Sequence, residues 1–328
     1  MGASDRGQRL ITAATQHALE AMTEAGSGDA GALALGLRNG VTGVGLRALA
    51  AKMLHAAAAA PERLGDICDN AAAGWLSRPV FPPRLRTEEP LPISPAFWTA
   101  FWDLVGLPPD VRRQVFAERV LMLAGELDPR INARMAAAAL EYPGVAEAAA
   151  RPVPGSYDLE AFAAYPPASL GYALREESLR AGGLTSPIAP TIIPLLRHMP
   201  PPLNHINIEV LQSIPLWSLV AGYSTARLDQ VAFGAFLMGQ VSHHYSALST
   251  AVTLAVGSLE RPSSLELTLD CLFKGWVHGR ETPALIGVSW DELWPLRIDQ
   301  VREALGVTPF DSPVAAAVRQ LSRTPPQT

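Results

Sequence analysis

No part of this sequence sustains the alternation of apolar and polar residues that a half-buried β-strand requires. Residues 8–60 are instead rich in alanine and leucine, two of the strongest helix formers, and end in an alanine run before Pro61. Because 48% of the residues are hydrophobic and 17% are charged, the chain can build a sizeable core. The sequence therefore predicts an all-α protein, a multi-helix bundle with Pro-rich connections.

Prolines mark the expected boundaries. Six prolines lie within 79–95, where the missing amide hydrogens exclude regular hydrogen-bonded structure. Ser94 before Pro95 predicts a helix start, with serine as the N-cap and proline as the first helical residue. We expect a helical region over 1–130 with a Pro-rich linker at 78–95, a helical domain over 131–310, and a tail over 311–328.

Charge and cysteine content exclude several classes of protein. The net charge is −5 and Lys52 and Lys274 are the only lysines, so the sequence predicts no nucleic-acid partner. Cys68 and Cys271 are too far apart in sequence for a disulfide framework or a cysteine zinc module. The first residues lack the apolar segment of a secretory signal, so we expect a cytoplasmic protein.

The longest run without a charged residue extends from Gln230 to Leu259 and is long enough to cross a bilayer. It also carries many serine, threonine and histidine residues, which a spanning helix disfavours. We interpret the run as buried helix, with an interfacial helix at a membrane surface as the alternative.

Residues 210–240 carry a pattern that resembles the coenzyme Q biosynthesis protein 4 family. Members of that family have His-Asp-x-x-His, eleven residues and then Glu, with Gly and Thr in the connecting turn. Here Leu216 and Trp217 fill the two variable positions, and Gly222 and Thr225 fall in the turn. Segments 166–173 and 275–307 also resemble the family, so the match covers about 150–308. The resemblance implies a ubiquinone-biosynthesis-protein-like fold for the second region.

The four polar positions of the family motif are occupied here by Ile214, Pro215, Ser218 and Gln230. Isoleucine and proline side chains donate no lone pair, and serine and glutamine offer only neutral oxygens. We therefore predict no metal and no cofactor. We expect Ser218 and Gln230 to hydrogen-bond to each other or to the backbone. Ser213 is predicted to cap a helix that begins at Pro215.

The resemblance implies relatives that bind a prenylated quinone precursor, associate peripherally with membranes and act within a biosynthetic complex. We predict a metal-free protein of this type that binds such a precursor, or a similar apolar small molecule, in a presenting or scaffolding role. A homodimer or a biosynthetic complex, peripheral at the membrane, fits that role. The predicted ligand contacts are Ile214, Trp217, Ser218, Tyr223, Gln230, Phe233 and Phe236. The alternative for these residues is plain core packing.

Two other functions stay open. The first is a metal-independent enzyme of a quinone or secondary-metabolite pathway that uses acid–base residues. Its candidates are His205, Glu209, His243 and His244. His205 and Glu209 share a helical face if Asn204 caps a helix, whereas adjacent histidines point about 100° apart. The second is a structural partner that completes a hetero-oligomer through residues 79–95 and the N-terminal helices.

Overall fold

The computed structural model describes residues 12–26, 28–40, 43–79, 88–153, 155, 157–180, 193–260 and 263–316. Within these residues the chain forms fifteen α-helices, two short 3-10 helices and no strand, with one isolated bridge between Ser169 and Arg297. The predicted all-α class is confirmed. The α-helices are α1 (Ala13–Ala25), α2 (Ala30–Arg38), α3 (Val44–Ala58), α4 (Leu64–Leu76), α5 (Pro95–Gly106), α6 (Pro109–Gly125), α7 (Ile131–Ala139), α8 (Val145–Ala149), α9 (Leu170–Arg180), α10 (Ile193–Arg197), α11 (Leu203–Ala221), α12 (Arg227–Val241), α13 (His244–Glu260), α14 (Leu265–Glu281) and α15 (Ile298–Leu305). The 3-10 helices are η1 (Pro61–Arg63) and η2 (Ala161–Ala164).

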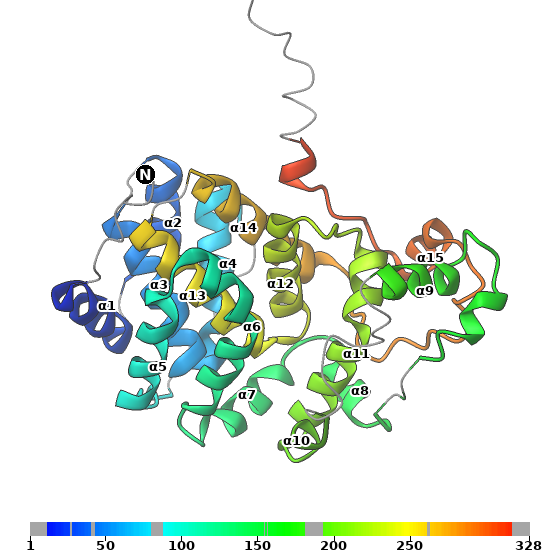
Figure 1. Ribbon diagram of the computed structural model, residues 1–328, viewed down its shortest axis with the longest axis horizontal. Coiled ribbons are helices and arrows are strands. Elements are labelled where there is room, and N and C mark those ends of the chain that lie inside the picture. The colour runs from blue at the N-terminus through cyan, green and yellow to red at the C-terminus, as the bar shows by residue number, and fades with distance from the viewer. Residues whose placement is uncertain are drawn as a thin grey trace, which may run out of the picture.

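The helices pack around two apolar clusters. Figure 1 shows α1–α6 and α13 on one side, α8–α11 and α15 on the other, and α12 between them. On the first side α12 contributes Ala235 and Met238, and on the second it contributes Phe233 and Phe236. Helix α12 is therefore a wall shared by both clusters. The division of the chain near residue 130 stays a prediction.

The helix start at Pro95 is confirmed. The Ser94 hydroxyl accepts a hydrogen bond from the Phe97 amide at 3.0 Å, which satisfies a donor that the first turn leaves free. Helix α5 then buries Phe97, Phe101 and Leu104 on one face. Part of the predicted linker, residues 80–87, lies outside the described residues.

The uncharged run forms two helices instead of one. Helices α12 and α13 are separated at Ser242, which adopts a left-handed backbone conformation with φ 56°. Both helices bury most of their residues, as we expected for this run. In the parts of the chain that the structure describes, every helix is too short or too polar to cross a membrane.

Two predictions about α11 are wrong. The helix does not begin at Pro215 with a Ser213 cap but runs from Leu203 to Ala221 through Pro215. Asn204 is likewise inside the helix, and Pro202 precedes it. An interior proline costs about 3 kcal/mol. Burial of Leu216 and Trp217 in the next turn contributes about 1.5–3 kcal/mol for each side chain and offsets that cost.

Candidate functional site

Helices α6, α12, α13 and α14 enclose a cleft with a volume of about 760 Å³. Clefts of roughly 300–1,000 Å³ are typical of small-molecule binding sites. The site depends on tertiary packing, because α6 and α13 are far apart in sequence and meet only in the folded chain.

One wall of the cleft is a row of hydroxyl groups on α13. Ser246, Ser249, Thr250 and Thr253 line the cleft, and their spacing of three and four residues places them on one helical face. Gly257 and Glu260 continue the same face toward the end of the helix. Ser246, Thr250 and Thr253 already form hydrogen bonds within the protein, so this wall offers a ligand mainly acceptor oxygens.

The facing walls are mainly apolar. Phe116 from α6 and Leu228 and Val231 from α12 line one part of the cleft. Leu265 and Leu272 from α14 line another. The cleft is therefore amphiphilic in cross-section, with hydroxyl groups on one side and hydrocarbon on the other.

The Ser249 hydroxyl lies on the wall of the cleft beside the Tyr245 phenol. Its Oγ is buried and has no hydrogen-bond partner among the described residues. The Tyr245 phenol is near, and burial raises its pKa while the Ser249 hydroxyl partly counteracts that rise, yet no hydrogen bond of normal geometry joins the two groups. Buried polar atoms without a hydrogen bond of normal geometry are uncommon, which distinguishes Ser249 from the other hydroxyl groups of this wall.

Three arginines and one glutamate surround the cleft. Arg112 is buried, forms an ion pair with Glu260 and donates to the carbonyl oxygens of Val105 at 2.7 Å and Leu107 at 3.1 Å. Arg113 and Arg227 are exposed at the mouth of the cleft and pair with no described residue. With Glu260 neutralised by Arg112, the mouth carries an excess of positive charge.

The two candidate histidines at the start of α13 have different contacts, and neither lines the cleft. His243 Nδ1 is 2.8 Å from the Ser246 Oγ, and burial lowers the His243 pKa to about 4. His244 Nε2 is 2.6 Å from the carbonyl oxygen of Ala57, and burial lowers its pKa to about 4 as well. Both imidazoles are therefore neutral at pH 7. His243 does not line the cleft itself, but it contacts Ser246, which does.

The other candidate pair, His205 and Glu209, shares a face of α11 as predicted. His205 Nε2 is 2.7 Å from Glu209 Oε2, and Glu209 Oε1 accepts from the Gly287 amide at 2.6 Å. Both side chains are buried, and neither lines the α6–α12–α13–α14 cleft. Among the described residues no group of three or more His, Cys, Asp or Glu is placed to hold a metal ion.

Three predicted ligand residues pack together on the opposite face of α12. Tyr223 and Phe233 have ring centroids 5.1 Å apart, and Phe233 stacks on Phe236 at 5.8 Å. Phe310 covers Tyr223 at 4.5 Å, and the Tyr223 hydroxyl is 2.7 Å from His278 Nδ1. These rings are part of the second apolar cluster.

The remaining predicted ligand residues are divided between the core and the surface. Trp217 is fully buried, and its indole N–H has no hydrogen-bond partner among the described residues. Ile214 and Ser218 are half-buried, whereas Gln230 is exposed and lines the cleft. The Ser218 hydroxyl donates to the Tyr223 carbonyl at 3.5 Å and the Gln230 amide to the Ser224 carbonyl at 2.7 Å, which confirms the predicted backbone bonds.

In the sequence, the hydroxyl residues of α13 served only as a reason to exclude a membrane span. Their spacing could have indicated a polar helical face. The sequence around Arg113 and Arg227 does not indicate that they lie together, because their position at the mouth of the cleft depends on how α6 and α12 pack.

No family model matches the sequence, and no curated protein matches it. Among solved structures, the chain is similar to one described as a "putative ubiquinone biosynthesis protein" from Nostoc punctiforme PCC 73102. The two share 20% identity with a TM-score of 0.48, over 65% of this chain and 97% of that one.

Proposed function

We propose that this protein binds a small molecule with an apolar chain and an anionic or strongly polar head, such as a prenylated quinone precursor. The ligand would occupy the α6–α12–α13–α14 cleft, where the protein would hold or present it. One observation carries the proposal: an amphiphilic cleft whose mouth has two exposed arginines that pair with no described residue.

The chemistry of each wall suits one part of such a ligand. Phe116, Leu228 and Val231 would bury the apolar chain, at about 25 cal/mol for each Å² removed from water. The Ser249 hydroxyl, which has no hydrogen bond of normal geometry to a described residue, would turn toward a ring oxygen of the ligand. Arg113 and Arg227 would bind a carboxylate or phosphate, which a guanidinium group contacts with two parallel hydrogen bonds.

A ligand of this kind partitions into membranes, so we propose that the protein collects it by peripheral contact with a membrane surface. The open mouth at Arg113 and Arg227 supports a presenting role, because a bound head group would stay accessible there to a partner enzyme. A homodimer or a biosynthetic complex is compatible with that role.

Thermal unfolding with geranylgeranyl phosphate tests the proposal. A ligand that binds only the native state raises the unfolding free energy by RT ln(1 + [L]/Kd), which is about 2.7 kcal/mol at a hundredfold excess over Kd. We expect stabilisation of the wild-type protein that is lost in Thr253→Trp, which fills the cleft, and kept in Thr99→Trp, an exposed site on α5. Stabilisation kept in both variants would favour the alternative placement beside Trp217 and Phe236. No stabilisation of the wild-type protein would refute the proposal.

A second candidate function, a metal-independent enzyme, is favoured by the contact between His243 and Ser246. A neutral imidazole can accept the proton of a serine hydroxyl, and this hydroxyl faces the cleft. Labelling with a fluorophosphonate probe, followed by peptide mass spectrometry, tests it. Labelling of Ser246 that is lost in His243→Gln would support the enzyme. An unlabelled Ser246 would contradict it and mean that the hydrogen bond only stabilises the start of α13.

A further inference from the structure

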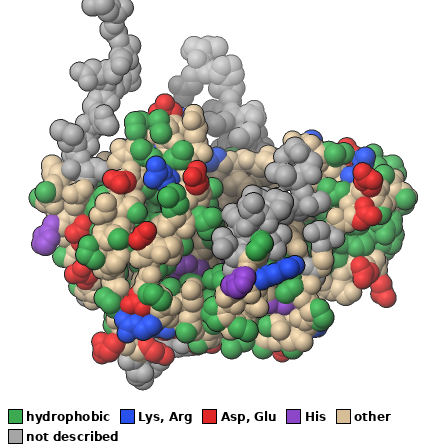
Figure 2. All heavy atoms as spheres, turned by 60° about the horizontal axis from the view of Figure 1, so that its bottom comes forward, with side chains coloured by type: hydrophobic (Ala, Val, Ile, Leu, Met, Phe, Trp, Pro, Cys, Tyr) green, Lys and Arg blue, Asp and Glu red, His purple; other side chains and the backbone are tan. Residues whose placement is uncertain are grey.

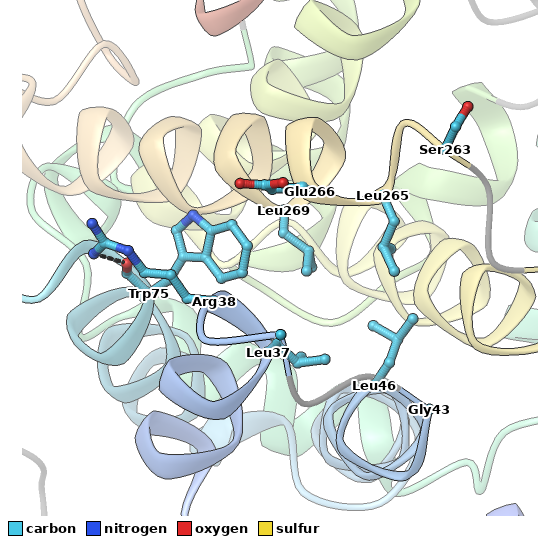
Figure 3. A pocket seen from close by; sticks show the side chains of 10 residues that line it. Leu37, Arg38, Gly43, Leu46, Trp75, Ser263, Leu265, Glu266 and Leu269 are labelled. Atoms are coloured by element: carbon cyan, nitrogen blue, oxygen red, sulfur yellow. Dashed lines mark hydrogen bonds between the residues drawn. The ribbon is translucent and has the colours of Figure 1, made fainter.

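A second cleft lies behind the first and is enclosed by α2, α3, α4 and α14. Its volume is about 370 Å³, and Figure 3 shows the side chains that line it. Leu37, Leu46, Trp75 and Leu269 make most of its surface apolar. None of the predicted ligand residues lines it.

Leu265 lines both clefts. It is the first residue of α14 and is half-buried. On the side of the large cleft its neighbours are Ser264 and Thr268, and on the side of the small cleft they are Ser263 and Glu266. The side chain of this one leucine therefore stands between the two spaces.

Gly257 on α13 lies at the same point between the two clefts, and its lack of a side chain leaves room there for the leucine side chains. A Cβ placed on Gly257 would lie 3.4 Å from Leu265 Cδ1 and 3.8 Å from Leu46 Cδ2. The two leucine methyl groups thus converge on the notch that the glycine leaves, and Figure 3 shows Leu265 and Leu46 pointing toward each other. Gly257 lines the large cleft and Leu46 the small one, so the contact closes the passage between them.

The lining of the small cleft suits the end of an apolar chain that extends beyond the large cleft. Its far end is fixed by Trp75, whose indole N–H donates to Asp270 Oδ1 at 3.2 Å, and by Arg38, which donates to the Trp75 carbonyl and to the Ser77 hydroxyl at 2.9 Å. The polar groups of that end are occupied by each other. The rest of the lining is mainly hydrocarbon, with the polar side chains of Ser263 and Glu266 at the end near Leu265.

We infer that Leu265 sets the length of the apolar chain that the protein binds, by ending the large cleft at its contact with Leu46 and Gly257. This inference rests on the proposed function. A chain that fits in the large cleft is bound along its whole length, and a longer chain must displace Leu265 or leave its end in water. Affinity rises roughly fourfold for each methylene buried, so it should stop rising at the length that reaches Leu265.

The test measures the dissociation constants of n-alkyl phosphates of increasing chain length, each below its critical micelle concentration, with the full-length wild-type protein and Leu265→Ala. For the wild-type protein we expect affinity to rise with length and then level off. In Leu265→Ala the two clefts join, so the levelling point should move to chains longer by several methylenes. Leu265→Val, a smaller truncation, should move it in the same direction by less.

Leu228→Ala is the matched control, because Leu228 is also half-buried but lines only the large cleft. It should weaken binding of every chain and leave the levelling point unchanged. Binding with the same levelling point in wild-type and both Leu265 variants would overturn the inference and leave the proposed function standing. If no alkyl phosphate binds, the proposed function fails, and the inference fails with it.

Discussion

The backbone of Gly275 in α14 lies against that of Ala232 in α12, so that a Cβ on Gly275 would stand only 2.2 Å from the Ala232 carbonyl oxygen. Gly279 approaches Phe236 in the same way, at 2.4 Å from the carbonyl oxygen. A side chain in place of Gly275 or Gly279 would therefore force α12 and α14 apart. Since α12 and α14 both line the cleft, this close contact fixes the width of the proposed site.

Gly275→Ala should destabilise the protein strongly, because the atom that the new methyl group meets is backbone and cannot move aside. Overpacking typically costs 1–3 kcal/mol, and we expect about 3 kcal/mol here. Urea denaturation measures it. Gly125→Ala is the control: a Cβ there meets nothing within 4 Å, so it should leave stability unchanged or raise it by about 0.5 kcal/mol. Equal stabilities for the two variants would contradict the packing.

A buried ion pair joins the two apolar clusters. Arg134 of α7 donates to both carboxylate oxygens of Glu62 in η1, with Nε–Oε2 at 3.0 Å, and both side chains are largely buried. Loss of one partner leaves a buried charge unpaired, so Glu62→Gln or Arg134→Met should each cost about 3 kcal/mol. The double variant should lose less than the sum of the two.

Denaturant unfolding of the four proteins gives the coupling free energy of this pair. Arg78→Met serves as the comparison, because its ion pair with Glu281 is half exposed and should contribute at most about 0.5 kcal/mol. Additive losses for Glu62 and Arg134 would show that the two side chains do not depend on each other.

Stability should fall with pH below neutrality. His243 and His244 have folded-state pKa values of about 4, below the value near 6.5 of an unfolded histidine. The unfolded chain therefore binds more protons between those two pH values, and the unfolding free energy decreases as pH falls through that window. The effect is on the order of 3 kcal/mol for each buried histidine.

Calorimetric unfolding between about pH 7 and pH 4.5 checks this dependence. His243→Asn should reduce the slope, because its amide does not titrate. His17→Asn, at an exposed position of the first helix, is the control and should leave the slope unchanged. A flat wild-type profile would mean that the histidines are solvated.

Removal of the mouth arginines should weaken anion binding. Each guanidinium group that contacts a phosphate contributes roughly 1–3 kcal/mol, so Arg113→Gln or Arg227→Gln should raise the dissociation constant of an alkyl phosphate about tenfold. Isothermal titration calorimetry measures the change. Arg119→Gln lies on α6 but outside the cleft and should have little effect. Equal losses for Arg113 and Arg119 would mean that only net charge matters.

Local signals in the sequence were reliable where nothing distant competed with them. Ser94 and Pro95 start α5 because a cap and a fixed φ act within one turn. On the face drawn in Figure 2, the described side chains show charges of both signs among hydrophobic ones and no continuous basic patch. The absence of a nucleic-acid partner stays a prediction.

Pro215 shows where local reasoning fails. Proline normally ends a helix, but α11 continues through it because Leu216, Trp217 and Val220 in the following turn are completely buried. The free energy gained by this burial comes from contacts with residues of other helices, so it cannot be read from the sequence next to Pro215. The intrinsic helix propensity of a residue is a weak signal where tertiary packing buries a face of the helix.

The proposed site was the part least accessible from sequence. The family resemblance drew attention to Trp217, Phe233 and Phe236, which the structure buries in the second apolar cluster. The cleft is on the other face of α12 and needs α6 to complete it. Only Gln230 belongs to both the predicted set and the cleft.

Photo-crosslinking tests the central claim most directly. An alkyl phosphate that carries a diazirine in its chain is bound to the wild-type protein, irradiated and located by peptide mass spectrometry. We predict crosslinks in α13 between Ser249 and Val256 and at Phe116 of α6, and their loss in Thr253→Trp. Crosslinks concentrated around Trp217, Tyr223 and Phe236, or a labelling pattern that Thr253→Trp leaves unchanged, would contradict the assignment of the ligand to this cleft.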